Sequence, residues 1–119
     1  MKVIEGKVIH GAQLGRKMGF PTANIDAQKI ENIENGVYFS YVDIEDQQYR
    51  AMSNIGFRPS VDGRTRLLET HIFDFEGDLY DKIIKVTLIR KIRDEQRFSS
   101  IDELQSQLKA DAAICRTSE

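Results

Sequence analysis

Glycines, one arginine and neutral oxygen donors gather in the stretch His10–Asn24, which reads HGAQLGRKMGFPTAN. Its glycines Gly11, Gly15 and Gly19 would let backbone N–H groups approach an anion, because no side chain blocks the way. Arg16 adds a planar donor fork with a permanent charge, which suits phosphate oxygens. The stretch therefore predicts a phosphate-binding loop, with a tight connection between two strands as the alternative.

The end of this stretch, Pro-Thr-Ala-Asn, offers oxygen atoms that could bind a metal ion. Thr22 has a hydroxyl and Asn24 an amide oxygen, and both are hard neutral ligands that suit Mg²⁺ whose charge is balanced by phosphates. The alternative is a turn held by local side-chain hydrogen bonds. The chain lacks the P-loop pattern GxxxxGK(S/T) and the GxGxxG pattern. Any nucleotide site here must therefore have a different architecture.

A lone carboxylate, Glu69, lies within the β-type run 67–70, where a charge without a function is disfavoured. As a general base it could accept a proton from a hydroxyl group, an effect typically worth ~10²–10⁴ in rate. The alternative is that strand alternation simply points Glu69 into solvent. His71 shares its strand face and fits either a structural hydrogen bond or a ligand contact. Phe98 fits either stacking on a flat aromatic ligand or packing beside a helix start.

Short β-type runs, each bounded by Gly, Asn, Asp or Pro, dominate most of the chain. They cover residues 2–10, 36–44, 49–55, 66–75 and 82–92. No rhythm of alternating strands and helices is visible, which argues against a parallel sheet. Strands at roughly ten-residue spacing predict a closed antiparallel barrel, because closure removes exposed edges in a small domain.

The C-terminal part has the pattern of an amphipathic helix over residues 100–115. Ser100 and Glu103 match a capping box, in which each side chain satisfies a free amide of the other. Apolar residues then recur at helical spacing: Ile101, Leu104, Leu108, Ala112 and Cys115. We expect this helix to pack on the barrel and to bury Cys115 rather than expose a reactive thiol.

Length and composition exclude several classes of protein. The 119 residues fit a single domain, 1–119, and the net charge of -2 is unlike that of a binder of duplex nucleic acid. One cysteine forms no intrachain disulfide, and with two histidines it cannot complete a four-ligand zinc site. Neither a membrane-spanning run nor a signal peptide is recognisable. We therefore expect a cytoplasmic domain without nucleic-acid or membrane partners.

The pattern GxxxGRxxGFPTAN at residues 11–24 resembles the signature loop of the riboflavin kinase (flavokinase) family. The similarity continues in family order through residues 35–38, 53–60, 69–72, 74–75, 78–80 and 92–98. The resemblance implies a closed six-stranded Greek-key barrel over about residues 2–98, followed by the helix. It also implies that the protein transfers the ATP γ-phosphate to the ribityl 5′-hydroxyl of riboflavin, giving FMN and ADP.

The resemblance assigns a role to each matching residue around the phosphates. The loop over the ATP phosphates would contain Gly11, Gly15 and Arg16. Thr22 and Asn24 would bind Mg²⁺, or a similar divalent ion, and the nucleotide phosphates, and Glu69 would be the catalytic base. His71 and Tyr80 would lie near the nucleotide. Asp81 departs from the family pattern, because many members have glycine there.

The resemblance also places a flap over the isoalloxazine ring of the flavin. Its residues Arg93, Gln96 and Phe98 would contact riboflavin or FMN, although Gln96 and Arg97 vary from the common basic pattern. The alternative function is a catalytically silent barrel that binds a flavin or a nucleotide, against which the presence of Glu69 argues. In many bacteria this module follows an FMN adenylyltransferase domain. We expect this chain to be a stand-alone kinase or such a module, without FAD synthesis.

Overall fold

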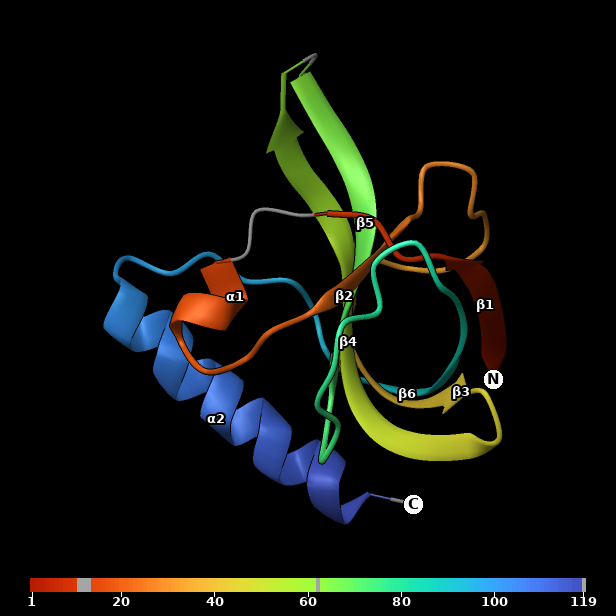
Figure 1. The fold of residues 1–119 in the computed structure, drawn as a ribbon. Helices are drawn as coiled ribbons and strands as arrows, with labels where there is room; N and C mark the ends of the chain where they lie inside the picture. Colours follow the sequence, from red (N-terminus) through yellow and green to blue (C-terminus); the bar gives the residue numbers. More distant parts are fainter. Residues whose placement is uncertain (11–13, 62, 119) are drawn as a thin grey trace.

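Six antiparallel strands curl into a nearly closed barrel within residues 1–10, 14–61 and 63–118, the part of the chain that this computed structural model describes (Figure 1). The strands are β1 (Lys2–Lys7), β2 (Ala23–Asp26), β3 (Gly36–Ile44), β4 (Gln47–Ser60), β5 (Gly63–Ile72) and β6 (Ile83–Arg93). The helices are α1 (Leu14–Lys17) and α2 (Ile101–Thr117), neither of which, within those residues, could cross a membrane. The expected antiparallel barrel with a C-terminal helix is confirmed.

The strands pair in the order β1-β6-β3-β4-β5-β2, so segments distant in the sequence lie side by side. β3, β4 and β5 follow one another as a meander, while β1 and β2 join the outer strands of the sheet through longer connections, as in a Greek key. These two edge strands meet just beyond β1, where the Ile9 N–H donates to the Asn24 carbonyl at 2.8 Å. This bridge closes the barrel at Asn24.

Residues 23–26 form β2, a strand that the β-type pattern does not predict. Its four residues are buried except for Asp26, so they show no alternation of apolar and polar side chains. Its backbone instead pairs with residues 67–70 of β5, more than forty positions away. Pairing with a distant strand, rather than local sequence, makes this segment a strand. The expected loop at Ala23 and Asn24 is therefore corrected.

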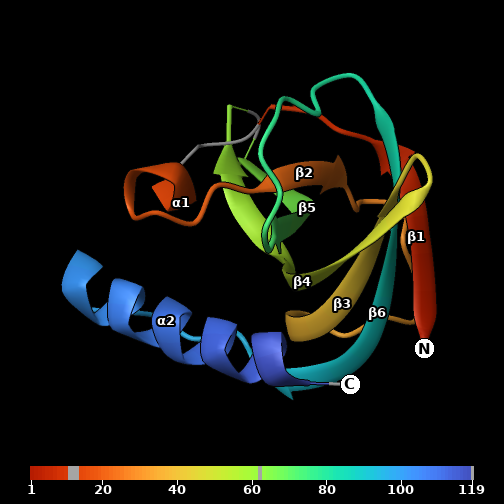
Figure 2. The ribbon, with the colours of Figure 1, turned by 60° about the horizontal axis from the view of Figure 1, so that its bottom comes forward.

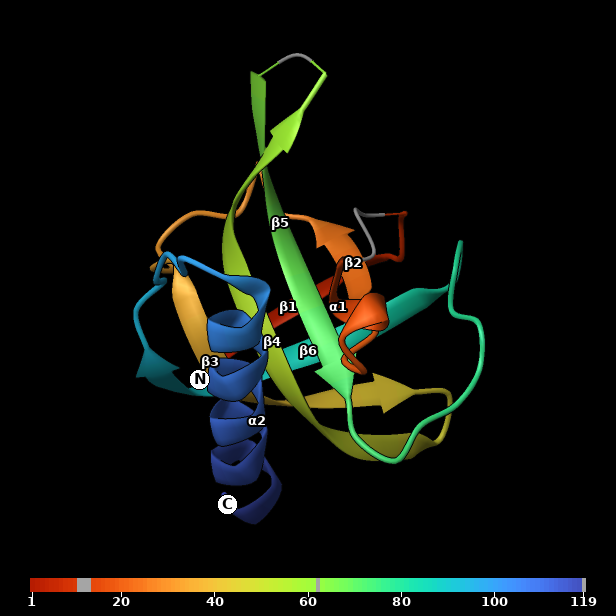
Figure 3. The same cartoon turned by 90° about the vertical axis from the view of Figure 1, so that its left-hand side faces the viewer.

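The other expected strands are present with different ends. β4 covers residues 47–60 rather than 49–55, and β5 covers 63–72 rather than 66–75. Their shared hairpin projects beyond the barrel (Figure 3), with Pro59 paired to Arg64 near its tip. A proline is tolerated at the end of a strand because the missing N–H costs least there. β1 ends at Lys7, before the expected residue 10.

Apolar side chains pack on both faces of the sheet. Inside the barrel, Ile55, Leu68 and Val86 are completely or almost completely buried. A second cluster, which includes Phe39 and Cys115, lies between the outer face and α2. Figure 2 shows α2 crossing one side of the barrel, so it covers only part of that outer face. The outer face is thus shared between helix packing and the polar residues described below.

The start of α2 uses the expected cap in a modified form. The Glu103 N–H donates to Ser100 Oγ at 3.1 Å, as a capping box requires. The Glu103 carboxylate, however, accepts from the backbone N–H and the hydroxyl of Ser99, at 3.0 and 2.7 Å, rather than from Ser100. These hydrogen bonds lower the pKa of Glu103. The helix continues to Thr117, two residues past its expected end.

The burial of Cys115 is confirmed and leads to a prediction about its reactivity. Its side chain is 0% exposed, and burial, reinforced by the charge of Asp111, raises the pKa of the thiol to about 12. Because the thiolate is the reactive form, the native protein should not react with a disulfide reagent such as DTNB at pH 8. One equivalent should react in denaturant. Rapid labelling of the native protein would contradict the buried position.

Candidate active site

An amide, a carboxylate and a second amide stand in line across three neighbouring strands. Asn24 of β2 pairs with Glu69 of β5, and Glu69 pairs with Asn54 of β4. Directly opposed residues of antiparallel strands project their side chains to the same face. This is the outer face, because Ile55 and Leu68, the next residue of β4 and the residue before Glu69 on β5, belong to the core inside the barrel. The fold thus brings Asn24 and Glu69 together.

Two oxygen atoms at the start of β2 have the spacing of metal ligands. The Thr22 hydroxyl donates to Asn24 Oδ1 at 3.0 Å, and Asn24 is only 3% exposed. Adjacent ligands of an octahedral Mg²⁺, each about 2.1 Å from the ion, lie about 3 Å apart. The described residues contain no cluster of three or more His, Cys, Asp or Glu side chains suited to a metal. In general, neutral oxygen ligands such as a hydroxyl and an amide suit Mg²⁺ whose charge is balanced by phosphates.

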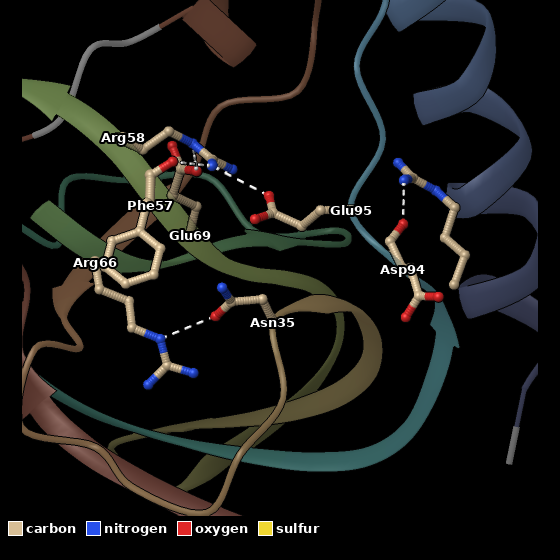
Figure 4. Close-up of polar contacts among 8 residues, drawn as sticks. Asn35, Phe57, Arg58, Arg66, Glu69, Asp94 and Glu95 are labelled. Carbon is tan, nitrogen blue, oxygen red and sulfur yellow. Dashed lines mark hydrogen bonds and ion pairs between the residues drawn. The ribbon is translucent and has the colours of Figure 1, made fainter. Parts of the chain in front are cut away.

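The carboxylate of Glu69 is held by an arginine that the sequence analysis does not single out. Arg58 Nε donates to Glu69 Oε1 at 2.7 Å, and Arg58 Nη1 lies 3.2 Å from Oε2 of Glu95 (Figure 4). Arg58 lies within the matching segment 53–60, on the same strand as Asn54. The predicted strand ends at residue 55, so the place of Arg58 in the matching segment 53–60 was the available signal.

Four of the residues expected near the nucleotide line one cavity of about 340 Å³: Arg16, Thr22, His71 and Tyr80. The cavity lies at the β2–β5 side of the barrel, where residues 77–80 also contribute to its wall. Gly11 lies outside the described residues, and the backbone of Gly15 belongs to α1. The structure therefore assembles side chains from four separate segments into a site of the size of a small ligand.

The turn beside this cavity explains why aspartate can stand at residue 81 in place of glycine. Asp81 has a φ of 67°, the left-handed conformation that glycine adopts most easily and that aspartate tolerates better than most residues. The preceding Tyr80 stacks on His10, with ring centroids 3.8 Å apart. Asp81 therefore maintains a turn that glycine would also allow, so this departure from the family pattern does not require a different backbone.

His71 holds the chain just before Thr22. The Pro21 carbonyl accepts a hydrogen bond from His71 Nδ1 at 2.8 Å, and the imidazole packs edge-on against Phe20 and Phe73. Burial lowers the pKa of His71, and the nearby positive charge of Arg116 adds to this, while the hydrogen bond opposes it. His71 thus fixes the backbone just before Thr22, which is the structural alternative for this residue.

The three residues expected to contact flavin divide between two environments. Arg93 donates from Nε and Nη2 to the carboxylate of Asp111 on α2, at 3.0 and 2.8 Å, and this carboxylate is 1% exposed. Gln96 and Phe98 instead line a cavity of about 460 Å³ against the first turns of α2. The Arg93 guanidinium therefore ties β6 to α2 and also lies over the Phe98 ring, 5.8 Å from its centroid, whereas Gln96 and Phe98 line the cavity.

The lowered pKa of His71 predicts how stability depends on pH. Below the ordinary value of 6.5 the unfolded chain binds a proton at this ring and the folded chain resists it, so stability falls as pH decreases. The free energy of unfolding should decline from pH 7 to about pH 5 in the natural protein and less steeply in His71→Gln. Denaturant unfolding at several pH values tests this, with His10→Gln as the matched control. Equal slopes in the natural protein and His71→Gln would contradict it.

Comparison with known proteins gives consistent results for sequence and structure. The family model described as "Flavokinase: Riboflavin kinase" matches residues 2–118. A bifunctional riboflavin kinase/FMN adenylyltransferase from Pseudomonas fluorescens is 44% identical over 115 residues, which are 95% of this chain and 37% of that protein.

Two solved structures share the fold at different levels of similarity. A crystal structure described as a macrolide-efflux protein from Streptococcus pneumoniae matches with a TM-score of 0.87 and 38% identity, covering 98% of this chain and 39% of the other. Riboflavin kinase from Trypanosoma brucei matches with a TM-score of 0.66 and 29% identity, covering 96% and 76%. The chain thus spans well under half of the Pseudomonas and Streptococcus proteins.

Proposed function

The chain belongs to the riboflavin kinase family, and from this premise we propose that it transfers the γ-phosphate of ATP to the 5′-hydroxyl of riboflavin, giving FMN and ADP. One observation carries the proposal beyond family membership. Glu69 stands directly opposite Asn24 on the outer face, which supports a role as a base beside the oxygen atoms of Thr22 and Asn24, proposed here to bind a phosphate-bound ion. Phosphoryl transfer needs this combination of positioned acceptor, base and charge stabilisation.

The donor nucleotide is proposed to bind in the cavity that contains Arg16, Thr22, His71 and Tyr80. Arg16 would contact phosphate oxygens through its donor fork. Thr22 and Asn24 would hold Mg²⁺, which supplies charge neutralisation at the phosphates when it is bound. His71 keeps this pair in place through its hydrogen bond to the Pro21 carbonyl.

The acceptor hydroxyl is proposed to approach Glu69 from the open side of the outer face. Glu69 Oε1 is occupied by Arg58, and within the described residues no hydrogen bond is found at Oε2. Oε2 would take the proton as the hydroxyl oxygen attacks the γ-phosphorus. Next to it, Asn54 Oδ1 is buried without a hydrogen-bond partner among the described residues. A polyhydroxylated chain such as ribityl would supply a donor to that oxygen.

The direct test is to incubate the protein with riboflavin, ATP and Mg²⁺ and to separate the flavins by chromatography. FMN and ADP should form in equal amounts, with no FMN when ATP is omitted. Binding of riboflavin or ATP without any FMN, even at high protein concentration, would favour the catalytically silent barrel instead. The adenylyltransferase named for the Pseudomonas relative is not part of this proposal.

Glu69→Gln tests the base while keeping the shape of the side chain. We expect kcat to fall about 10²–10⁴-fold, because the amide cannot accept the proton. Riboflavin binding, followed by quenching of flavin fluorescence, should persist. Glu5→Gln, a change at an exposed residue of β1, is the matched control and should leave kcat unchanged. If Glu69→Gln keeps activity within about threefold, Glu69 is not the base.

A further inference from the structure

Arg58 connects two carboxylates that come from different parts of the chain. Glu69 lies on β5, and Glu95 lies in the segment after β6, which leads to α2. Arg58 Nε donates to Glu69 Oε1 at 2.7 Å, while Nη1 donates to Glu95 Oε2 at 3.2 Å and to the Phe57 carbonyl at 2.8 Å. The three charged side chains are between 20% and 32% exposed. Arg58 is therefore fixed at several atoms rather than free in solvent.

The carboxylate of Glu95 rests on the bare backbone of Gly56. A Cβ atom placed on Gly56 would overlap with the carboxylate oxygens of Glu95. Gly56 lies in β4 two residues before Arg58, so both residues belong to the same strand face. The contact and the ion pair involve the same carboxylate and define one arrangement, which we call the Glu95 seat: Gly56 below the carboxylate and Arg58 beside it.

The segment after β6 is directed into this seat. In Figure 4 Glu95 points toward Arg58 and Glu69, while the side chain of the neighbouring Asp94 is directed away from them. Asp94 instead pairs with Lys91, at 2.5 Å. Asp94 and Glu95 are thus held by different partners, and this fixes the orientation of the segment where it leaves β6. This segment continues into Gln96 and Phe98, which line the larger cavity.

We infer that Arg58 is a positioning residue that orients Glu69 for proton transfer and couples this orientation to the seating of Glu95. This inference rests on the proposed function, since it concerns the same reaction. By holding Oε1, Arg58 leaves Oε2 of Glu69 for the acceptor hydroxyl. Arg58 also shares its guanidinium with Glu95. It therefore favours one position of the Glu69 carboxylate when the 94–98 segment lies against the barrel. The flavin-side segment and the base are thereby linked through one side chain.

Substitutions at Arg58 separate orientation of the base from binding of the nucleotide. Arg58→Met should lower kcat about tenfold or more, because small displacements of a reacting group are costly, with the KM for ATP unchanged. Arg58→Lys keeps a charge but loses the fork, so it should recover only part of kcat. Arg64→Met, on the same hairpin, is the matched control and should match the natural protein. A kcat of Arg58→Met within twofold of the natural value would overturn the inference.

Substitutions in the seat test the coupling. Glu95→Gln and Gly56→Ala should each raise the KM for riboflavin by about twofold to fivefold, as expected for loss of a partly exposed ion pair. Because both changes act on one contact, the double variant should be no worse than either single variant. Additive effects of the two changes would contradict a shared seat, and the Glu95→Gln result stands even if Gly56→Ala folds poorly.

A measurement without turnover distinguishes failure of this inference from failure of the proposed function. Trypsin can cut after Arg97, and seating of Glu95 should protect this bond in the free protein. Glu95→Gln and Gly56→Ala should be cut faster there than the natural protein, and Glu76→Gln, an exposed control, should not. Equal rates in all four proteins would overturn the seat. Absence of FMN formation with protected cleavage would reject the kinase while retaining the seat.

Discussion

The register of β5 against its two neighbours is the constraint on which the rest of the site depends. Because Asn24, Glu69 and Asn54 are directly opposed, their side chains leave the sheet on one face and in one line. A slip of β5 by one residue against both neighbours would turn Glu69 into the apolar interior, since side chains alternate along a strand. The apolar residue Leu68 holds this register, because the same slip would turn its completely buried side chain outward.

Around this line, side chains of β4 and β5 hold segments that have no regular structure of their own. His71 binds the Pro21 carbonyl, and Arg66 binds the carbonyls of Ile30 and Ile33 together with the side chain of Asn35. Arg58 holds Glu95. Three loops are therefore held by side chains of β4 and β5. Such support allows loop residues to carry chemistry on a rigid framework.

Helix α2 also helps to hold the segment that follows β6. The buried ion pair between Arg93 and Asp111 joins the end of β6 to α2, and the seat of Glu95 follows within two residues of it. A buried carboxylate is tolerated only when its partners satisfy it, and here Arg93 and Gln107 both donate to Asp111. The segment between β6 and α2 is thus anchored at its start and again at its end by the Ser100 cap. The site is framed by elements fixed on both sides.

The sequence by itself determined the antiparallel barrel, the helix with its cap and the buried Cys115, because these follow from local spacing and residue chemistry. It also indicated Glu69, Thr22 and Asn24 through the ordered motifs of one family. Only the tertiary structure decided that residues 23–26 form a strand, because that strand depends on pairing with β5. It likewise decided that Arg93 binds Asp111 and that Arg58 joins Glu69 to Glu95. These contacts link residues far apart in the sequence, and local periodicity carries no information about such distances.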